Sequence, residues 1–346
     1  MDETDETRVR LAHVSDIHLP DLPPFWPRHW NVKRTLGYAN WHRRRRFIHR
    51  RDVIDAIVAH MKAAAPDHIL VSGDLINIGL PQEYQRAAQW LADVGPPEDV
   101  CVVPGNHDIY TPIAFAKGVG LWDSYMTPDG RANASAILGA GAQRMPSQPI
   151  GHDRHQATAA ETYFPFVRPV GPVDIIALNS AVPTAPGVAS GSLGPQQRQA
   201  LGALLEDRGR AGRFRLVMLH HPPLQDLGGP ARGLSDASAL QDVLEKAGAE
   251  LVIHGHNHVH SERWIKGPER PIPVIGIASA SVARSSGHED LGAYQVYEVA
   301  RSGNAYSVQV ERFGLAEPDG HVVALDAYTL DPERNETQRA EPAMID

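Results

Sequence analysis

Five apolar runs in this chain are each followed at once by a short polar motif, and this arrangement limits the fold more than any other feature. The runs cover residues 9–14, 69–71, 100–103, 214–219 and 251–253. The motifs are Asp16-Ile17-His18, Gly73-Asp74, Gly105-Asn106-His107-Asp108, His220-His221-Pro222 and Gly255-His256-Asn257-His258. In an α/β protein, the carboxyl ends of parallel strands meet at one edge of the sheet, where ligand sites are built. The pattern therefore predicts an α/β fold that brings Asp, Asn and His side chains together.

Periodicity between and after these runs supports the same fold class. Apolar residues at helical spacing predict helices over residues 47–65, 83–91, 195–207 and 236–247. Apolar and polar residues alternate within 271–325, which is typical of antiparallel strands.

We expect one domain over residues 8–325, with flexible tails at 1–7 and 332–346. The stretch 110–160 includes a long segment rich in Gly, Ala, Ser and Pro, and we predict that it forms a lid or cap loop. The segment 20–46 interrupts the chain directly after the first polar motif, and we interpret it as an insertion.

Composition points to a cytoplasmic protein. The one cysteine, Cys101, lies in an apolar run and has no cysteine partner within the chain. No stretch approaches the roughly 20 apolar residues of a membrane span. The acidic residues 1–7 lack the apolar segment of a signal peptide.

The insertion concentrates positive charge in a chain whose formal net charge is −8. Residues 28–51 contain nine Lys or Arg and no Asp or Glu, and residues 25–51 contain three of the six tryptophans. One interpretation is a solvated charge run on an insertion packed against the body. The alternative is a surface for an anionic membrane, which would make the protein peripheral on the inner membrane, while nucleic acid is less favoured. Because the insertion leaves from the first motif, we expect it to flank the mouth of the site.

Two of the motifs predict one metal ion and a bridge to a second. Asp16 and His18 are two residues apart on a segment expected to be extended, so their side chains would share one face. Asp74 follows a strand, and its two oxygens can bridge ions about 3.5–4 Å apart, as in two-metal hydrolases.

The other motifs add neutral ligands. Asn106 offers an amide oxygen, while His220, His256 and His258 offer imidazoles. Such a set favours transition metals, Mn²⁺, Fe²⁺/Fe³⁺ or Zn²⁺, over Ca²⁺ and Mg²⁺. His221 is adjacent to His220 and remains an alternative ligand.

Two further residues are predicted to act in catalysis. His107, as an imidazolium, could donate a proton to a leaving group or a hydrogen bond to a phosphoryl oxygen. Asp108 could accept a hydrogen bond from His107 or from a ligand.

The complete set of motifs resembles the calcineurin-like metallophosphoesterase superfamily, whose pattern is D-x-H, G-D, G-N-H-[DE], H and G-H-x-H. The resemblance covers about residues 9–260 and implies a four-layer αββα sandwich with a dinuclear metal centre. It implies that one ion is held by Asp16, His18, Asp74 and His258, and the other by Asp74, Asn106, His220 and His256. It favours His220 over His221 and gives the His107 position a role in protonation or transition-state stabilisation.

The His-His-Pro-Pro stretch and the late Gly-His-Asn-His look most like the class III cyclic-nucleotide phosphodiesterase and glycerophosphodiesterase branch. We therefore expect a phosphodiesterase acting on a phosphate-ester small molecule or a lipid. A pyrophosphatase that cleaves a lipid such as UDP-2,3-diacylglucosamine at a membrane surface is the alternative, followed by phosphomonoesterase or nuclease activity. The physiological substrate, the metal and the oligomeric state stay open.

Overall fold

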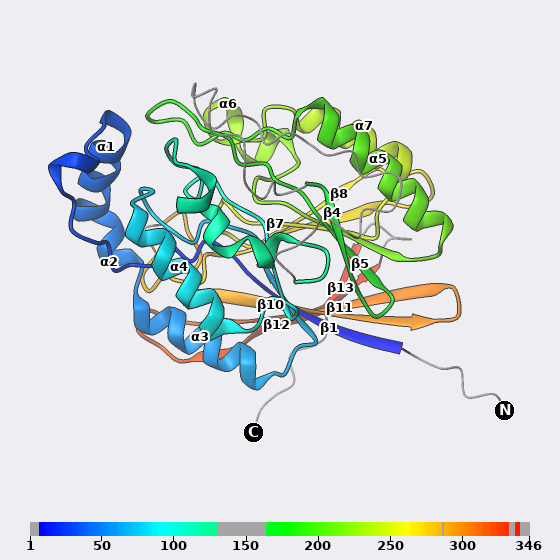
Figure 1. The fold of residues 1–346 in the computed structure, drawn as a ribbon. Helices are drawn as coiled ribbons and strands as arrows, with labels where there is room; N and C mark the ends of the chain where they lie inside the picture. The colour runs from blue at the N-terminus through cyan, green and yellow to red at the C-terminus, as the bar shows by residue number, and fades with distance from the viewer. Residues whose placement is uncertain (1–6, 131–163, 286, 332–335, 340–346) are drawn as a thin grey trace.

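Two β-sheets face each other in the computed structural model, which describes residues 7–130, 164–285, 287–331 and 336–339. Helices cover the outer side of each sheet, as Figure 1 shows with α3 and α4 on one side of the molecule and α5 and α7 on the opposite side. The predicted αββα sandwich is therefore confirmed. Among the helices of the described residues, none has the length and apolar character needed to cross a membrane.

The first sheet combines both ends of the chain, in the order β13-β12-β11-β10-β1-β2-β3. The strands β1, β2 and β3 run parallel, and β10 pairs antiparallel with β1. The predicted antiparallel C-terminal strands are also confirmed, because β10 to β13 form successive antiparallel pairs. Their bounds are Thr7–Val14 (β1), His68–Val71 (β2), Val100–Val102 (β3), Ala293–Ser302 (β10), Ala305–Leu315 (β11), Val322–Asp331 (β12) and Glu336–Arg339 (β13).

The second sheet has the order β4-β5-β6-β7-β9-β8. Its four inner strands are parallel, and an antiparallel strand closes each edge. The bounds are Phe166–Val170 (β4), Val173–Ala177 (β5), Phe214–Met218 (β6), Leu251–His254 (β7), Ser261–Ile265 (β8) and Ile272–Gly276 (β9).

Alternation along the strands divides the apolar side chains between two cores. In β5, Ile175 belongs to the core between the sheets, while its neighbour Ile176 packs toward the helices outside. The outer helices present apolar faces at helical spacing, such as Leu240 and Leu244 in α7. The helices are α1 (Val32–Asn40), α2 (Arg46–Ile48), α3 (Arg51–Ala63), α4 (Pro81–Val94), α5 (Gly194–Arg210), α6 (Gly229–Arg232) and α7 (Ala237–Ala247).

The helix predicted over 47–65 is interrupted, and the insertion before it is largely helical. His49 has extended backbone angles and bridges to Val282, while Arg50 N donates to Ser281 O. These bonds to a neighbouring segment end the first helical stretch and delay α3 until Arg51. Within the insertion, α1 continues through a π-helical turn, Trp41–Arg45, into α2.

The predicted lid and tails coincide only in part with the described residues. Residues 131–163 of the lid, and 1–6, 332–335 and 340–346 of the tails, lie outside them. The described start of the lid contains the 3-10 helices Phe115–Lys117 and Val119–Met126. The ordered sheet continues past residue 325 through β12, and β13 pairs within the expected C-terminal tail.

Candidate metal centre

The structure brings the seven predicted metal ligands together where the strands of both sheets end. Asp16 and His18 follow β1, Asp74 follows β2, and Asn106 lies beyond β3. The second sheet contributes His220 after β6, and His256 and His258 after β7. All seven side chains are buried, so water screens their charges little.

The ligand loops do not have the extended backbone expected for the Asp-x-His and His-x-His motifs. Five of the predicted ligands have a positive φ: Asp16 (52°), His18 (42°), Asp74 (57°), His256 (73°) and His258 (57°). Hydrogen bonds between loops hold this conformation, since Asp16 N donates to Gly73 O and His18 N to Asp74 O, both at 2.9 Å. Each pair therefore reaches one site through left-handed turns and not through strand alternation.

Gly255 permits a close approach between loops of the two sheets. A Cβ at this position would lie 2.0 Å from Ser15 Oγ and 2.6 Å from Asp16 Oδ2. The same Asp16 oxygen accepts a hydrogen bond from His256 N at 2.9 Å. The glycine thus lets the two loops share a carboxylate.

One group of donor atoms comprises Asp16, His18 and His258. His258 Nε2 lies 3.1 Å from Asp16 Oδ1 and 3.3 Å from His18 Nε2. The Nδ1 atoms of the two histidines bind groups outside this cluster. His18 Nδ1 donates to Ile76 O, and His258 Nδ1 lies 2.9 Å from Glu289 Oε1. This arrangement turns both Nε2 atoms inward, as in histidines that ligate metals.

A second group surrounds His220. Its Nδ1 donates to Ser72 O at 2.7 Å, which directs Nε2 toward Asn106 Oδ1 at 3.2 Å and His256 Nδ1 at 3.3 Å. Asp74 Oδ2 lies 3.5 Å from His220 Nε2 and 3.7 Å from His18 Nε2. The Asp74 carboxylate therefore stands between the two groups.

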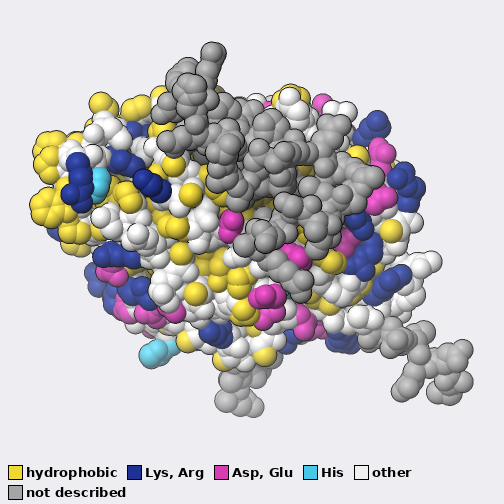
Figure 2. Space-filling model, viewed as in Figure 1, with side chains coloured by type: hydrophobic (Ala, Val, Ile, Leu, Met, Phe, Trp, Pro, Cys, Tyr) yellow, Lys and Arg dark blue, Asp and Glu magenta, His cyan; other side chains and the backbone are white. Residues whose placement is uncertain are grey.

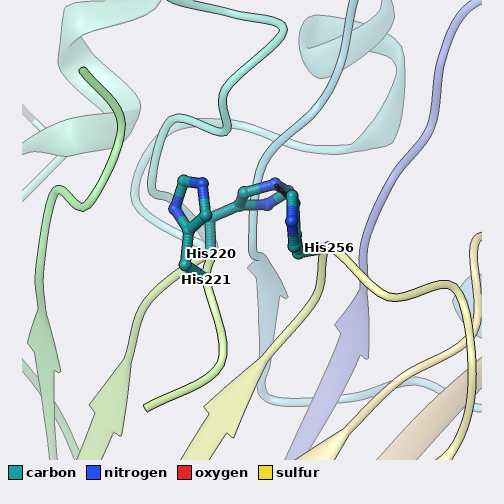
Figure 3. A group of neighbouring side chains, drawn as sticks. All are labelled: His220, His221 and His256. Carbon is teal, nitrogen blue, oxygen red and sulfur yellow. Dashed lines mark hydrogen bonds between the residues drawn. The ribbon is translucent and has the colours of Figure 1, made fainter. Parts of the chain in front are cut away.

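His221 belongs to the same ring cluster as His220 and His256, which Figure 3 shows after the ends of β6 and β7. Its nitrogens already have partners in the protein, Ser180 Oγ at 2.8 Å and Ala189 O at 3.1 Å. His256 Nε2, in contrast, is buried without a hydrogen-bond partner in the described structure. Because both nitrogens of His221 are held by groups outside the cluster, the geometry favours His220 and His256 over His221 as metal-binding residues.

The carboxylates give the centre a field that attracts cations. Burial alone would lower the pKa of His220, but Asp74 and Asp16 outweigh it and raise that pKa to about 9. For His258 too, the effect of burial is outweighed, because Asp16 and Glu289 raise its pKa to about 9. Burial works against ionisation of Asp74, yet His220 and His107 lower its pKa. Buried carboxylates and imidazoles with inward nitrogens fit divalent transition metals.

Asp108 lies behind the centre and not beside the His107 ring. Its carboxylate accepts hydrogen bonds from the backbone N–H groups of Asp74, Leu75, Ile76 and Gly105. Burial, together with Asp74, raises its pKa to about 7. Asp108 thus positions the Asp74 loop. Of the two donors expected for it, the structure shows the predicted ligand Asp74, through its backbone N–H, and not the His107 ring.

His107 faces the centre as a neutral ring in this arrangement. Its backbone N donates to Asp74 Oδ1 at 2.7 Å, and its Nδ1 donates to Asn77 O. Burial and the nearby Arg45 lower its pKa to about 4, which disfavours the expected imidazolium.

Arg45 was not predicted as a site residue, yet its guanidinium reaches the centre from the insertion. It donates to His18 Nε2 at 3.0 Å through Nη2 and to His107 Nε2 at 3.2 Å through Nη1. The sequence showed only a run of four arginines, and nothing in that run distinguishes the one that points inward. The local asymmetry of charge was the only available signal.

The centre opens into a cavity of about 510 Å³. Asp74, Asn106, His107, His256 and His258 line it together with four cationic side chains, Lys33, Arg44, Arg45 and Arg232. Three of these cations come from the insertion, so the expectation that it flanks the mouth of the site is confirmed. The lining suits an anionic ligand.

A family model for the calcineurin-like phosphoesterases matches residues 9–260, which include all seven predicted ligands. The chain belongs to the calcineurin-like phosphoesterase family. The groups of donor atoms in this phosphoesterase fit the dinuclear metal centre that the family motifs predict.

Relatives and solved structures agree with the family. The phosphoesterase is 49% identical over 43 residues to the glycerophosphodiester phosphodiesterase GpdQ of Enterobacter lignolyticus, covering 12% of this chain and 15% of the relative. It is 32% identical over 100 residues to a probable cyclic nucleotide phosphodiesterase of Synechococcus sp. (strain WH7803), covering 28% and 37%. The matches thus span well under half of these relatives. A dimetal phosphatase from Danio rerio has the same fold, with a TM-score of 0.51 and 12% identity over 91% of this chain and 98% of that one.

Proposed function

We propose that this phosphoesterase hydrolyses phosphodiesters at a centre of two transition-metal ions, Mn²⁺, Fe²⁺/Fe³⁺ or Zn²⁺. Asp16, His18 and His258 would hold one ion, Asn106, His220 and His256 the other, and Asp74 both. The observation that carries the proposal is the position of Asp74 Oδ2, within 3.7 Å of an inward nitrogen of each group. The names of the two curated relatives, both phosphodiesterases, support a diester substrate.

Two such ions supply Lewis acidity and a nucleophile derived from water at neutral pH. The protein supplies the remaining contacts to the substrate. A nitrogen lone pair accepts one bond, so His18 Nε2 serves either Arg45 or an ion. When His18 acts as a ligand, the Nη2–H of Arg45 that pointed to it can bind a phosphoryl oxygen, which guanidinium recognises well. His107 lies beside Arg45 and faces the same oxygens.

The test is turnover of bis-p-nitrophenyl phosphate by the full chain loaded with Mn²⁺. Removal of the metal by a chelator should abolish turnover, and Mn²⁺ should restore it. Asp74→Asn should lower kcat/KM about 10³-fold, which corresponds to roughly 4 kcal/mol, and should reduce the bound metal measured by elemental analysis. The matched control is Asp242→Asn on the exposed side of α7. Full turnover and full metal content in Asp74→Asn would refute the proposal.

The four cations that line the cavity support a pyrophosphate bond as the second candidate. A nucleotide attached through a diphosphate to a lipid would place two anionic groups among Arg44, Arg45 and Arg232. Arg232→Gln should then lower kcat/KM for a nucleoside diphosphate sugar at least tenfold more than for bis-p-nitrophenyl phosphate. An equal loss with both substrates would leave the simple diester as the preferred substrate class.

A further inference from the structure

The insertion, together with Phe47 directly after it, exposes most of the large apolar side chains at the surface of the described residues. Five of the eight exposed large hydrophobic residues among the described ones fall between residues 26 and 47. Scattered exposed apolar residues are normal, but a concentration in one short segment marks an interaction site. We define the outer face of the insertion by these five residues and three exposed cations near them: Trp26, Trp30, Val32, Leu36, Phe47, Arg28, Arg43 and Arg46.

The packing of α1 separates this outer face from the cavity. Gly37 lies against the body, since a Cβ there would meet Tyr110 Oη at 2.6 Å, and Arg34 donates to Ile78 O. Val32 and Leu36 are one helical turn apart and are 69% and 57% exposed. Figure 1 shows that α1 and α2 project at one end of the molecule, where hydrophobic and Lys/Arg side chains gather in Figure 2.

The cations of the outer face are not neutralised locally. Within the parts of the chain that the structure describes, Arg28, Arg43 and Arg46 form no ion pair with a carboxylate. Arg46 instead lies over the Phe47 ring, 4.5 Å from its centre. The face therefore presents positive charge and apolar groups together, although the whole chain carries a net charge of −8.

Two features of the insertion favour lipid over nucleic acid as the partner: the packing of aromatic rings beside the outer face, and the aliphatic residues within that face. Binding of single strands uses free aromatic faces on which bases stack. In the insertion, Tyr38 stacks on Phe25 at 4.9 Å and on Trp41 at 6.2 Å, so these rings are occupied with one another. The aliphatic Val32 and Leu36 cannot stack on bases, but they can enter the boundary between lipid headgroups and acyl chains.

We propose that the outer face of the insertion docks on an anionic bilayer and that the enzyme cleaves a phosphoester presented at that surface. The second half of this inference rests on the proposed function. The inner side of the same insertion carries Lys33, Arg44 and Arg45 into the cavity. A docked insertion would therefore set the cavity mouth beside the headgroups, so that an amphiphile could enter headgroup first.

The test is sedimentation of the full chain with vesicles of equal parts phosphatidylglycerol and phosphatidylcholine, compared with pure phosphatidylcholine. The triple variant Arg28→Gln/Arg43→Gln/Arg46→Gln should lower the partition constant about 100-fold, because each cation near an anionic surface contributes about fivefold. Trp30→Ser/Leu36→Ser should lower it on both kinds of vesicle. All variants should hydrolyse bis-p-nitrophenyl phosphate at the wild-type rate.

The matched control removes the same charge elsewhere, as Arg210→Gln/Lys246→Gln/Arg263→Gln, and should bind anionic vesicles like the wild type. If both triple variants lost vesicle binding equally, the loss would follow from net charge alone, and the proposal would be overturned. Absence of vesicle binding, or binding only to a single-stranded oligonucleotide, would also overturn it. Vesicle binding without turnover of the soluble diester would refute the proposed function and leave the docking surface standing.

Discussion

At the metal centre, backbone conformation matters as much as ligand chemistry. Five of the predicted ligands occupy the left-handed region, where non-glycine residues other than Asn, Asp and His are uncommon. Asp and His therefore satisfy two requirements at once, since they supply the donor atom and tolerate the turn. The close approach at Gly255 adds a steric requirement that no side chain could meet.

The first prediction concerns that approach. Gly255→Ala should displace Ser15 or Asp16, because its methyl group would lie 2.0 Å from Ser15 Oγ. We expect at least a 100-fold loss of kcat/KM and weaker Mn²⁺ binding by calorimetry, since a misplaced ligand loses its contribution to catalysis.

The control for this prediction is Gly202→Ala in α5. The nearest contact of the added methyl group there would be Val243 at an ordinary 3.5 Å. Alanine is also the better helix former by about 1 kcal/mol, so this variant should be fully active and slightly more stable. Normal Mn²⁺ affinity in Gly255→Ala would contradict the steric argument.

At the scale of elements, Glu83 in the first turn of α4 both caps that helix and holds the loop that contacts His107. The Glu83 carboxylate accepts from the N–H groups of Asn77 and Leu80 at 2.8 Å, and from Ile78. The carbonyl of Asn77 in turn accepts from His107 Nδ1. One buried carboxylate therefore shapes the loop that orients a ring in the cavity.

The second prediction follows from this link. Glu83→Ala would leave buried N–H groups without acceptors, at about 1–3 kcal/mol each. Because three N–H groups lose their acceptor, we expect urea unfolding to show a free energy lower by at least about 3 kcal/mol, together with a reduced kcat. Gln85→Ala, on the exposed side of the same helix, should change neither quantity. A stability loss with unchanged kcat would show that the loop does not control His107.

At the scale of the whole molecule, the metal centre lies at the seam between the two sheets. The first sheet supplies Asp16, His18, Asp74 and Asn106, and the second sheet supplies the three histidines. Arg168 in β4 adds a second tie, because its guanidinium donates to Thr127 O, Pro97 O and Val100 O. With a shared core as well, we expect the two sheets to unfold in one transition.

The third prediction concerns stability in acid. Burial, with a smaller effect from Arg168, lowers the pKa of His68 to about 3. Between pH 6.5 and 3 the unfolded chain binds a proton that the folded chain does not, so His68 destabilises the fold progressively as the pH falls. His68→Leu should therefore gain about 1–3 kcal/mol relative to the wild type between pH 7.5 and pH 4.5.

This third prediction is tested by urea unfolding of His68→Leu and of the wild type at pH 7.5 and pH 4.5. His321→Leu, at an exposed position just before β12, is the control and should follow the wild-type pH dependence. The same pH slope in His68→Leu and the wild type would contradict a buried neutral imidazole.

Much of the fold could be predicted from the sequence, because strand ends and helical periodicity are local patterns. The positions of Asp74, Asn106 and His220 followed from strands that end before them. The left-handed turns at Asp16 and His258 could not be predicted from the local sequence, because hydrogen bonds to other loops impose them. Arg45 was missed for a related reason, since four adjacent arginines differ only in where a π-helical turn points them. For Asp108 the motif left two hydrogen-bond donors open, His107 and a ligand, and only the folded loops show that the donors are the N–H of Asp74 and three other backbone N–H groups.

The place of β10 between β11 and β1 has a consequence for biosynthesis. β1 leaves the ribosome first, but the strand that covers its free edge arrives about 280 residues later. At about 5–20 residues per second, that edge waits roughly 15–55 s. An uncovered strand edge is a template for pairing with other chains. Nascent chains on one messenger therefore need separation or a chaperone until β10 has been made.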